Sequence, residues 1–230
     1  MAVYVVTGGT GALGSAVVRL LLDRGHDVSV PFRERARFDA LKADMPGGER
    51  LFGEKAEMDQ VDDAARLMAA VAQRAGRIDG VAALAGGYAS SGGLEVAPPS
   101  EWNEMLSVNL ATAYATCRAA VPHLVATRGT IVTCSSRAVT NGGAGSGYVV
   151  SKAGVEALTR ELALETRGRG LRVNAIAPGT IDTPANRRAM PKADTSTWTP
   201  PEEIAAVVAF LLSPESAPIT GAVVPVHARR

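Results

Sequence analysis

A tyrosine and a lysine four positions apart, Tyr148 and Lys152, are the residues whose spacing best suits catalysis. Positions four apart lie on one face of a helix, so the ammonium group can lie beneath the phenol. A free tyrosine has a pKa of about 10 and is a poor acid or base at neutral pH. A nearby cation favours the phenolate and lowers that pKa. The pair therefore indicates acid–base chemistry, although a Y-x-x-x-K match also arises by chance on surface helices.

A glycine-rich turn near the N-terminus supplies a second chemical signal. The run Thr7-Gly8-Gly9-Thr10-Gly11-Ala12-Leu13-Gly14 joins a strand pattern at 3–7 to a helical pattern at 14–24. Its last three glycines fit G-x-G-x-x-G, which lets the backbone approach a pyrophosphate at the start of a helix. A merely tight turn is the alternative, but the strand–turn–helix context favours nucleotide binding.

Strand and helix patterns alternate along the rest of the chain. Further strands are predicted at 28–30, 80–84, 129–134, 172–176 and 222–226, and helices at 62–75, 100–126, 148–167 and 201–212. Continuous apolar strands that alternate with helices predict an α/β fold, a parallel sheet covered on both faces. The least regular stretch, 183–199, is polar and broken by prolines, which suits a mobile flap over a site.

The composition limits the classes of partner. The chain has 230 residues, 47% of them hydrophobic, a net charge of +1 and only 4% aromatic residues. Near-zero charge and few aromatics argue against nucleic-acid binding, and no apolar stretch is long enough to span a membrane. Cys117 and Cys134 lack metal-ligand spacing and are expected to be reduced thiols in a cytoplasmic protein. We expect no metal and a small-molecule substrate.

Taken together, the motifs resemble those of the short-chain dehydrogenase/reductase family. The glycine turn matches that family's T-G-x-x-x-[AG]-x-G at Thr7, Gly8, Ala12 and Gly14, and four further segments follow in the family's order over nearly the whole chain. Length and these segments favour the single-domain branch. The resemblance implies a single doubly wound Rossmann domain over 1–230 with about seven parallel strands. It also implies hydride transfer between a nicotinamide and a carbonyl or secondary alcohol, as in 3-oxoacyl-thioester or general carbonyl reductases.

The resemblance assigns catalytic roles to four residues. Tyr148 would exchange the proton, and Lys152 would bind the nicotinamide ribose and favour the tyrosinate. Asn109 would bend its helix and hold a relay water. A serine at the end of strand 130–134 would donate to the substrate carbonyl. Counting forward from the strand selects Ser136, our preferred residue, whereas counting back from Tyr148 selects Ser135.

Cofactor contacts are implied at the glycine turn, after the strands and on the reactive helix. Ala85 and Gly86 stand where the family shows N-N-A-G, without its asparagines; Asp59 would reach the adenine; and the segment after Pro178-Gly179 would cover the nicotinamide. The implied set is Thr7, Gly8, Gly9, Thr10, Gly11, Ala12, Leu13, Gly14, Arg33, Asp59, Ala85, Gly86, Tyr148, Lys152, Pro178, Gly179, Ile181 and Thr183.

The end of the second strand favours NADP(H) over NAD(H). An acidic residue about 20 positions past the glycine turn binds the ribose 2′-hydroxyl of NAD, whereas an arginine accommodates the 2′-phosphate of NADP. Arg33 follows Pro31-Phe32, where NAD-selective relatives have Asp. Glu34 and the lack of a basic residue in the glycine turn are contrary signs.

Other properties are left open by the sequence. The helices 100–126 and 148–167 resemble the pair that joins subunits in the family, so a homodimer or homotetramer is expected. Arg187, Arg188 and Lys192 in the flap could attract an anionic substrate or form a solvated charge cluster. A non-catalytic dinucleotide sensor on the same fold is the alternative function, and an intact Ser136, Tyr148 and Lys152 argues against it.

Overall fold

The first strand is covered by side chains on both of its faces. In β1 (Val3–Thr7) every residue is buried; Val3 and Val5 join one apolar cluster, whereas Tyr4 and Val6 join another. A strand covered on both faces is typical of a parallel sheet with helices on each side. The computed structural model describes residues 1–227, so the last three residues of the expected domain 1–230 lie outside the described residues.

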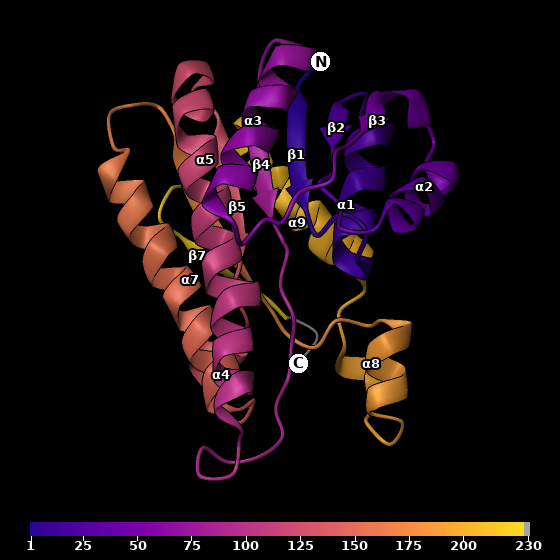
Figure 1. The fold of residues 1–230 in the computed structure, drawn as a ribbon, viewed down its shortest axis with the longest axis vertical. Coiled ribbons are helices and arrows are strands. Elements are labelled where there is room, and N and C mark those ends of the chain that lie inside the picture. The colour runs from indigo at the N-terminus through magenta and orange to yellow at the C-terminus, as the bar shows by residue number, and fades with distance from the viewer. Residues whose placement is uncertain (228–230) are drawn as a thin grey trace.

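Within the described residues, seven strands form one sheet. The others are β2 (Asp27–Ser29), β3 (Leu51–Phe52), β4 (Gly80–Ala83), β5 (Thr130–Cys134), β6 (Arg172–Pro178) and β7 (Val223–Val226). Their order is β3-β2-β1-β4-β5-β6-β7 and every pairing is parallel (Figure 1). This confirms the predicted doubly wound α/β sheet.

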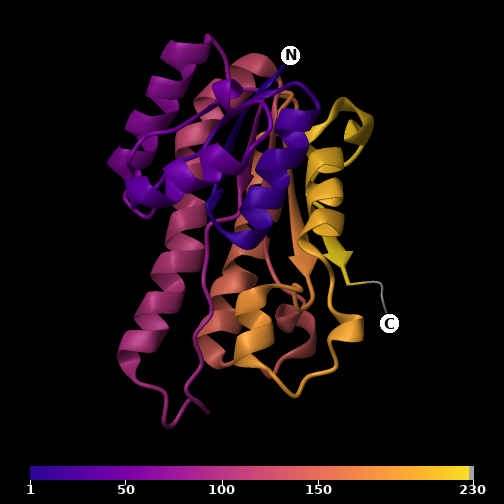
Figure 2. The same ribbon diagram turned by 90° about the vertical axis from the view of Figure 1, so that its right-hand side faces the viewer.

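Two helical layers cover the sheet. The cluster around Tyr4 and Val6 takes its helical residues from α1 (Ala12–Asp23), α2 (Arg35–Asp44) and α9 (Pro201–Leu212). The cluster around Val3 and Val5 takes them from α3 (Val61–Ala75), α5 (Thr112–Thr127) and α7 (Ser146–Glu165). Figure 2 shows α1 in indigo beside α9 in yellow. The helices therefore hold the strands so that their carboxyl ends share one edge.

The strand order reverses direction next to β1. The chain passes from β1 outward to β2 and β3, then returns to place β4 on the other side of β1, with Thr7 opposite Ala83. Loops that leave β1 and β4 in opposite directions open a crevice at their carboxyl ends, where ligands bind in folds of this kind. The glycine turn follows β1 and thus faces this crevice.

The long helix expected at 100–126 contains a wide turn. It begins as α4 (Pro99–Met105), continues as a π-helical segment at Leu106–Ala111 and ends as α5. Such π segments often lie at functional sites. Asn109 lies inside this π segment and is 1% exposed. The family resemblance had predicted a bend in the helix at Asn109, which the helical periodicity of the sequence did not indicate.

The stretch at 183–199 is more regular than the sequence predicted. It holds the short helix α8 (Pro184–Ala189) and a 3₁₀ turn at Thr195–Thr197, and Ile181 bridges to Thr199. Proline is favourable at the first turn of a helix because its missing N–H has no intrahelical acceptor there. The other short helix, α6 (Ala138–Asn141), follows β5. In residues 1–227 no helix is long and apolar enough to cross a membrane.

Candidate active site

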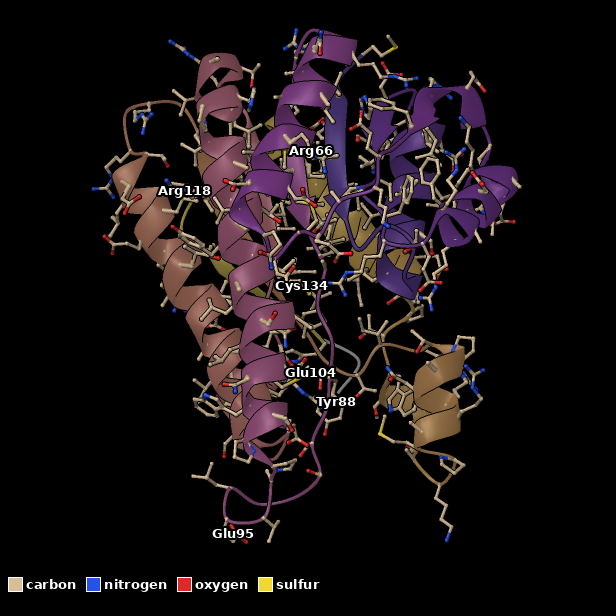
Figure 3. All side chains as sticks on the ribbon, viewed as in Figure 1. Arg66, Tyr88, Glu95, Glu104, Arg118 and Cys134 are labelled. Carbon is tan, nitrogen blue, oxygen red and sulfur yellow. The ribbon has the colours of Figure 1, made fainter. Side chains whose placement is uncertain are left out.

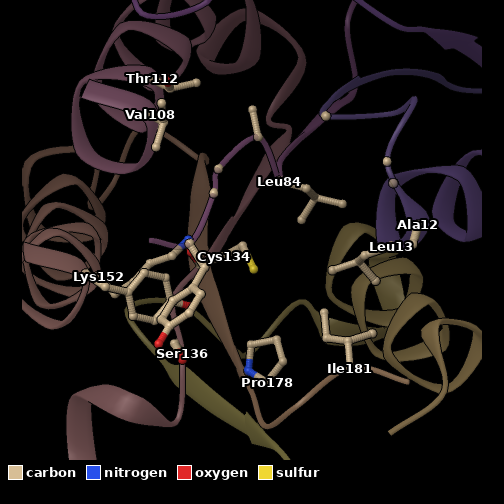
Figure 4. A pocket seen from close by; sticks show the side chains of 18 of the residues that line it. Ala12, Leu13, Leu84, Val108, Thr112, Cys134, Ser136, Lys152, Pro178 and Ile181 are labelled. Atoms are coloured by element: carbon tan, nitrogen blue, oxygen red, sulfur yellow. The ribbon is translucent and has the colours of Figure 1, made fainter. Parts of the chain in front are cut away.

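A cleft of about 1010 Å³ opens at the carboxyl ends of the strands. Figure 4 shows Ala12 and Leu13 at the start of α1 on one side of this cavity, with Ser136 and Lys152 on the other. Pro178 and Ile181, after β6, form part of its margin. The structure therefore brings the glycine turn and the Tyr–Lys pair, 134 residues apart in sequence (148 − 14), to one cavity.

The glycine turn has the geometry of a phosphate cradle. Gly8 has a φ of 69°, and the Gly11 amide donates to its carbonyl at 2.9 Å. A side chain at Gly14 would collide with that same carbonyl oxygen. Helix α1 begins after Gly11 without a side-chain cap, so its first amides have no intrahelical acceptor and face the cleft. These free donors at a helix start fit the pyrophosphate of a dinucleotide.

Lys152 is a buried cation on the cleft wall. Its side chain lies on α7, is 5% exposed, and donates from Nζ to the Cys134 carbonyl at 2.9 Å. Nζ lies 5.9 Å from the centre of the Tyr148 ring. Burial lowers the pKa of Lys152 below its ordinary value because desolvation disfavours the charged form. The hydrogen bond to the Cys134 carbonyl, at the end of β5, thus holds the ammonium group in position.

Tyr148 is less acidic than its spacing from Lys152 suggested. Burial raises the pKa of the phenol above 10, and this outweighs a hydrogen bond from Ser136 that favours the phenolate. The Lys152 ammonium group donates to the Cys134 carbonyl, so the expected bias of Tyr148 toward the phenolate stays a prediction. The Tyr88 ring packs edge-on against Tyr148, with centroids 5.0 Å apart.

The two candidate serines face different surroundings. Ser135 is 2% exposed, and its hydroxyl donates to the Glu156 carboxylate at 2.8 Å. Ser136 lies close enough to the Tyr148 phenol to lower its pKa, and Ser136 Oγ accepts from the Ala138 amide at 3.2 Å. Ser135 is thus tied to α7, whereas Ser136 stands beside the phenol. Glu156, one turn beyond Lys152, was missed from the sequence although its spacing places it on the same face.

The Asn109 side chain is fully engaged by its neighbours. Its Oδ1 accepts from the Gly87 amide at 3.1 Å, and its Nδ2 donates to the Gly87 carbonyl at 3.1 Å and to Ser151 Oγ at 3.2 Å. A side chain at Gly86 would lie 2.6 Å from Asn109 Oδ1 and 3.2 Å from Lys152 Nζ. Asn109 therefore fixes the loop after β4 against the π segment.

Most residues implied as cofactor contacts line this cleft. They are Gly8, Thr10, Gly11, Ala12, Leu13, Gly14, Arg33, Ala85, Gly86, Tyr148, Lys152, Pro178, Gly179 and Ile181. The candidate serines, Ser135 and Ser136, line it too.

Four of the implied contacts do not line the cleft. Thr7 is fully buried and accepts from the Ala85 amide at 3.2 Å, and Gly9 packs against Val30. Asp59 accepts from the Ser107 hydroxyl at 3.0 Å. Thr183 accepts from the Asn186 amide at 3.1 Å, so it caps α8. The side chains of Thr7, Asp59 and Thr183 therefore each accept a hydrogen bond within the fold.

Charged residues gather where the second strand meets the cleft. Arg33 and Glu57 form an ion pair with Nε and Oε2 2.8 Å apart, and Arg37 pairs with Glu34 at 3.2 Å. Arg33, Glu34 and Arg37 all line the cavity and are exposed. Glu34, the contrary sign for the cofactor, is thus engaged by an arginine one turn along α2.

The sequence did not single out several other lining residues. They include Glu104 and Arg137, and also Asn186 and Met190 on and after α8. Figure 3 shows Glu104 and Tyr88 near the middle of the molecule. These residues belong to short helices and loops that carry no sequence motif, so only the fold brings them together. Among residues 1–227 no group of three His, Cys, Asp or Glu side chains could hold a metal ion, and both cysteines are free thiols.

Known proteins are similar to this chain in sequence and in fold. Residues 9–228 match the family described as enoyl-(acyl carrier protein) reductase. The cis-4-hydroxycyclohexanecarboxylate dehydrogenase of Sinomonas cyclohexanicum is 34% identical over 97% of this chain and 94% of its own length. The 3beta-hydroxysteroid dehydrogenase 1 of Eggerthella lenta is 32% identical over 94% and 88%. The crystal structure of levodione reductase superposes with a TM-score of 0.89 and 29% identity, over 98% of this chain and 96% of that one.

These matches define the class of protein. The chain belongs to the short-chain dehydrogenase/reductase family. It is an NAD(P)-dependent oxidoreductase that acts on a carbonyl or alcohol group. None of the matches supports a non-catalytic sensor.

Proposed function

We propose that this protein is an NADP(H)-preferring reductase of ketones in which Tyr148 donates the proton. The observation that carries the proposal is the meeting of Ser136, Tyr148 and Lys152 on one wall of the cleft whose other side is the glycine turn. A bound nicotinamide supplies or accepts the hydride. The protein's own task is then to hold the carbonyl and exchange one proton.

The Ser136 and Tyr148 hydroxyls would both bind the carbonyl oxygen. Ser136 would hold that oxygen, and the phenol would protonate it as negative charge develops. Because burial raises the pKa of Tyr148, the phenol keeps its proton at neutral pH, which suits carbonyl reduction. Lys152 would hold the nicotinamide ribose. Asn109 would position the loop at Gly87, and a relay water beside it stays a prediction.

Arg33 is the residue that supports a preference for NADP(H). It lines the cleft at the end of β2, and a guanidinium can bind phosphate oxygens through two parallel hydrogen bonds. Arg37 lines the same region. Their ion-pair partners, Glu57 and Glu34, are exposed, so a 2′-phosphate could replace them at small cost.

The substrate class follows from the relatives and from the cleft walls. Two of the relatives act, by their names, on a hydroxyl group of an alicyclic ring. In this chain Tyr88 and Met190 bring large apolar side chains to the cleft, 63% and 40% exposed. We therefore favour a ring ketone or its alcohol, with residues 183–199 as the flap that covers it.

Assembly and location complete the proposal. Tyr114 on α5 and Val150 on α7 are exposed large apolar side chains, which supports a homodimer or homotetramer through these helices. The two free thiols support a reducing compartment such as the cytoplasm. A small-molecule substrate is proposed, without a nucleic-acid or membrane partner. The single domain expected over 1–230 belongs to the same proposal.

Replacing the proton donor tests the proposed function. In Tyr148→Phe the ring stays and the hydroxyl is lost, so kcat for ketone reduction should fall by about 10²–10⁴, with Kd for NADPH within about threefold of the wild type. Reduction of a panel of ring ketones, followed by loss of nicotinamide absorbance, gives the rate. Tyr114→Phe, on the exposed face of α5, is the matched control. Turnover near the wild-type value in Tyr148→Phe would refute the assignment.

A further inference from the structure

Arg137 is a half-buried cation that follows Ser136 directly and lines the same cleft. Its main-chain amide donates to the Pro178 carbonyl at 2.8 Å, which ties it to the turn after β6. A side chain built at Gly179 would come within 3.8 Å of both Cζ and Nε of Arg137. The guanidinium therefore lies beside this turn, within van der Waals reach of a side chain at Gly179.

The Arg137 guanidinium has no ion-pair partner among residues 1–227. The other arginines of the cleft differ, since Arg33 and Arg37 are each paired with a glutamate. In the flap, Arg187 is held by Asp182 with Nε and Oδ1 2.6 Å apart. A cation in a cleft that has no ion-pair partner is available to bind an anionic group of a ligand.

The position of Arg137 indicates whether the anion that it binds belongs to the cofactor or to the substrate. The phosphates of a dinucleotide would lie at Ala12 and Leu13, across the cavity from Ser136 in Figure 4. Arg137, next to Ser136 in the chain, belongs to the side where the substrate's carbonyl would sit. The carboxylate of Glu104 also lines the cleft and would repel an anion close to α4. An anionic group of the substrate is therefore favoured beside Pro178-Gly179.

We propose that Arg137 forms a carboxylate-binding subsite, so that the substrate is a ketone or alcohol bearing a carboxylate away from the reacting carbon. This inference rests on the proposed function because it uses Ser136 and Tyr148 to locate the carbonyl. A guanidinium binds a carboxylate through two parallel hydrogen bonds, which fixes orientation as well as affinity. Arg137 would thereby align the ring carbonyl with Ser136.

A binding experiment tests the subsite without requiring turnover. The full-length protein is saturated with NADPH, or with NADH if only that binds, and titrated with cyclohexanecarboxylate and with cyclohexanecarboxamide by ligand-observed NMR. We expect the wild type to bind the carboxylate about 30-fold more tightly than the amide. Arg137→Met should remove that difference, and Arg137→Lys should restore part of it. Arg169→Met, an exposed arginine between α7 and β6 that does not line the cleft, is the control for the loss of one positive charge.

Turnover adds a second readout. For 4-oxocyclohexanecarboxylate and its carboxamide, Arg137→Met should lower kcat/KM about 30-fold more for the acid than for the amide. Equal losses for both substrates, or wild-type protein that does not distinguish the carboxylate from the amide in binding, would overturn the inference. Arg137-dependent carboxylate binding without turnover of any ketone would support the subsite while refuting the proposed reaction.

Discussion

The two ends of the cleft hold their charged groups in different ways. At the end of β2, Arg33 and Arg37 are exposed, and each shares its charge with a glutamate. At the reactive end, Lys152 and Asn109 are buried and hydrogen-bonded to main-chain groups. Exposed pairs contribute little to stability and can exchange partners, whereas a buried polar group keeps one geometry. Mutations at the exposed end should therefore alter cofactor preference readily. Mutations of the buried residues at the reactive end should instead impair the reaction.

The largest effect that follows from this contrast concerns Lys152. Lys152→Met keeps the length of the side chain but removes the cation that would hold the nicotinamide ribose, so kcat for ketone reduction should fall by about 10²-fold as the cofactor loses its alignment. Because removing a buried cation also removes its desolvation cost, the thermal midpoint should stay level or rise. Steady-state kinetics and thermal unfolding measure the two effects. Lys42→Met, on the exposed side of α2 and outside the cleft lining, is the control, and a similar rate loss there would mean that the effect is not specific to the buried lysine.

A second prediction concerns pH. The raised pKa of Tyr148 means that the phenol is protonated through the neutral range. Reduction should be level there and lose about tenfold per pH unit once the pH passes that pKa, since a phenolate has no proton to donate. Alcohol oxidation needs the phenolate and should rise with pH over the same range. Profiles of kcat/KM in both directions give the test, and reduction that rises with alkaline pH would contradict it.

The smallest effect is expected at the exposed end. Arg33→Ala should raise KM for NADPH about tenfold, because one charge-assisted contact to the 2′-phosphate is lost. KM for NADH should change less than about twofold. Arg66→Ala removes an exposed, ion-paired arginine that is outside the cleft lining, and serves as the control. Equal changes for the two cofactors would mean that Arg33 does not contact the 2′-phosphate.

Much of this arrangement could be predicted from the sequence. The glycine turn, the alternating strands and helices and the Tyr148–Lys152 spacing are local patterns, and local geometry largely determines what they form. The expected strands and helices have bounds within a few residues of those observed, apart from the π segment around Asn109. The elements α2, β3, α6 and α8 were not expected.

Side-chain pairing could not be predicted in the same way. Asp59 Oδ2 accepts from the Ser107 hydroxyl and Thr183 Oγ1 from the Asn186 amide, and contact of either residue with the cofactor stays a prediction. The spacing of Tyr148 and Lys152 places both on one face of α7, but Lys152 is directed to the Cys134 carbonyl, which comes from a different strand. Polar groups bind the nearest partner in space, and for Asp59 and Lys152 that partner is distant in sequence.

The sequence by itself determined the class of this protein, because its motifs are short and carry their geometry within a single turn or helix. Tertiary structure decided which serine faces the phenol, which arginines are paired, and that Arg137 lies beside the turn at Gly179 with no counter-ion among residues 1–227. The physical reason is that desolvation and ion pairing depend on every group within a few ångströms. Only the folded sheet brings those groups together.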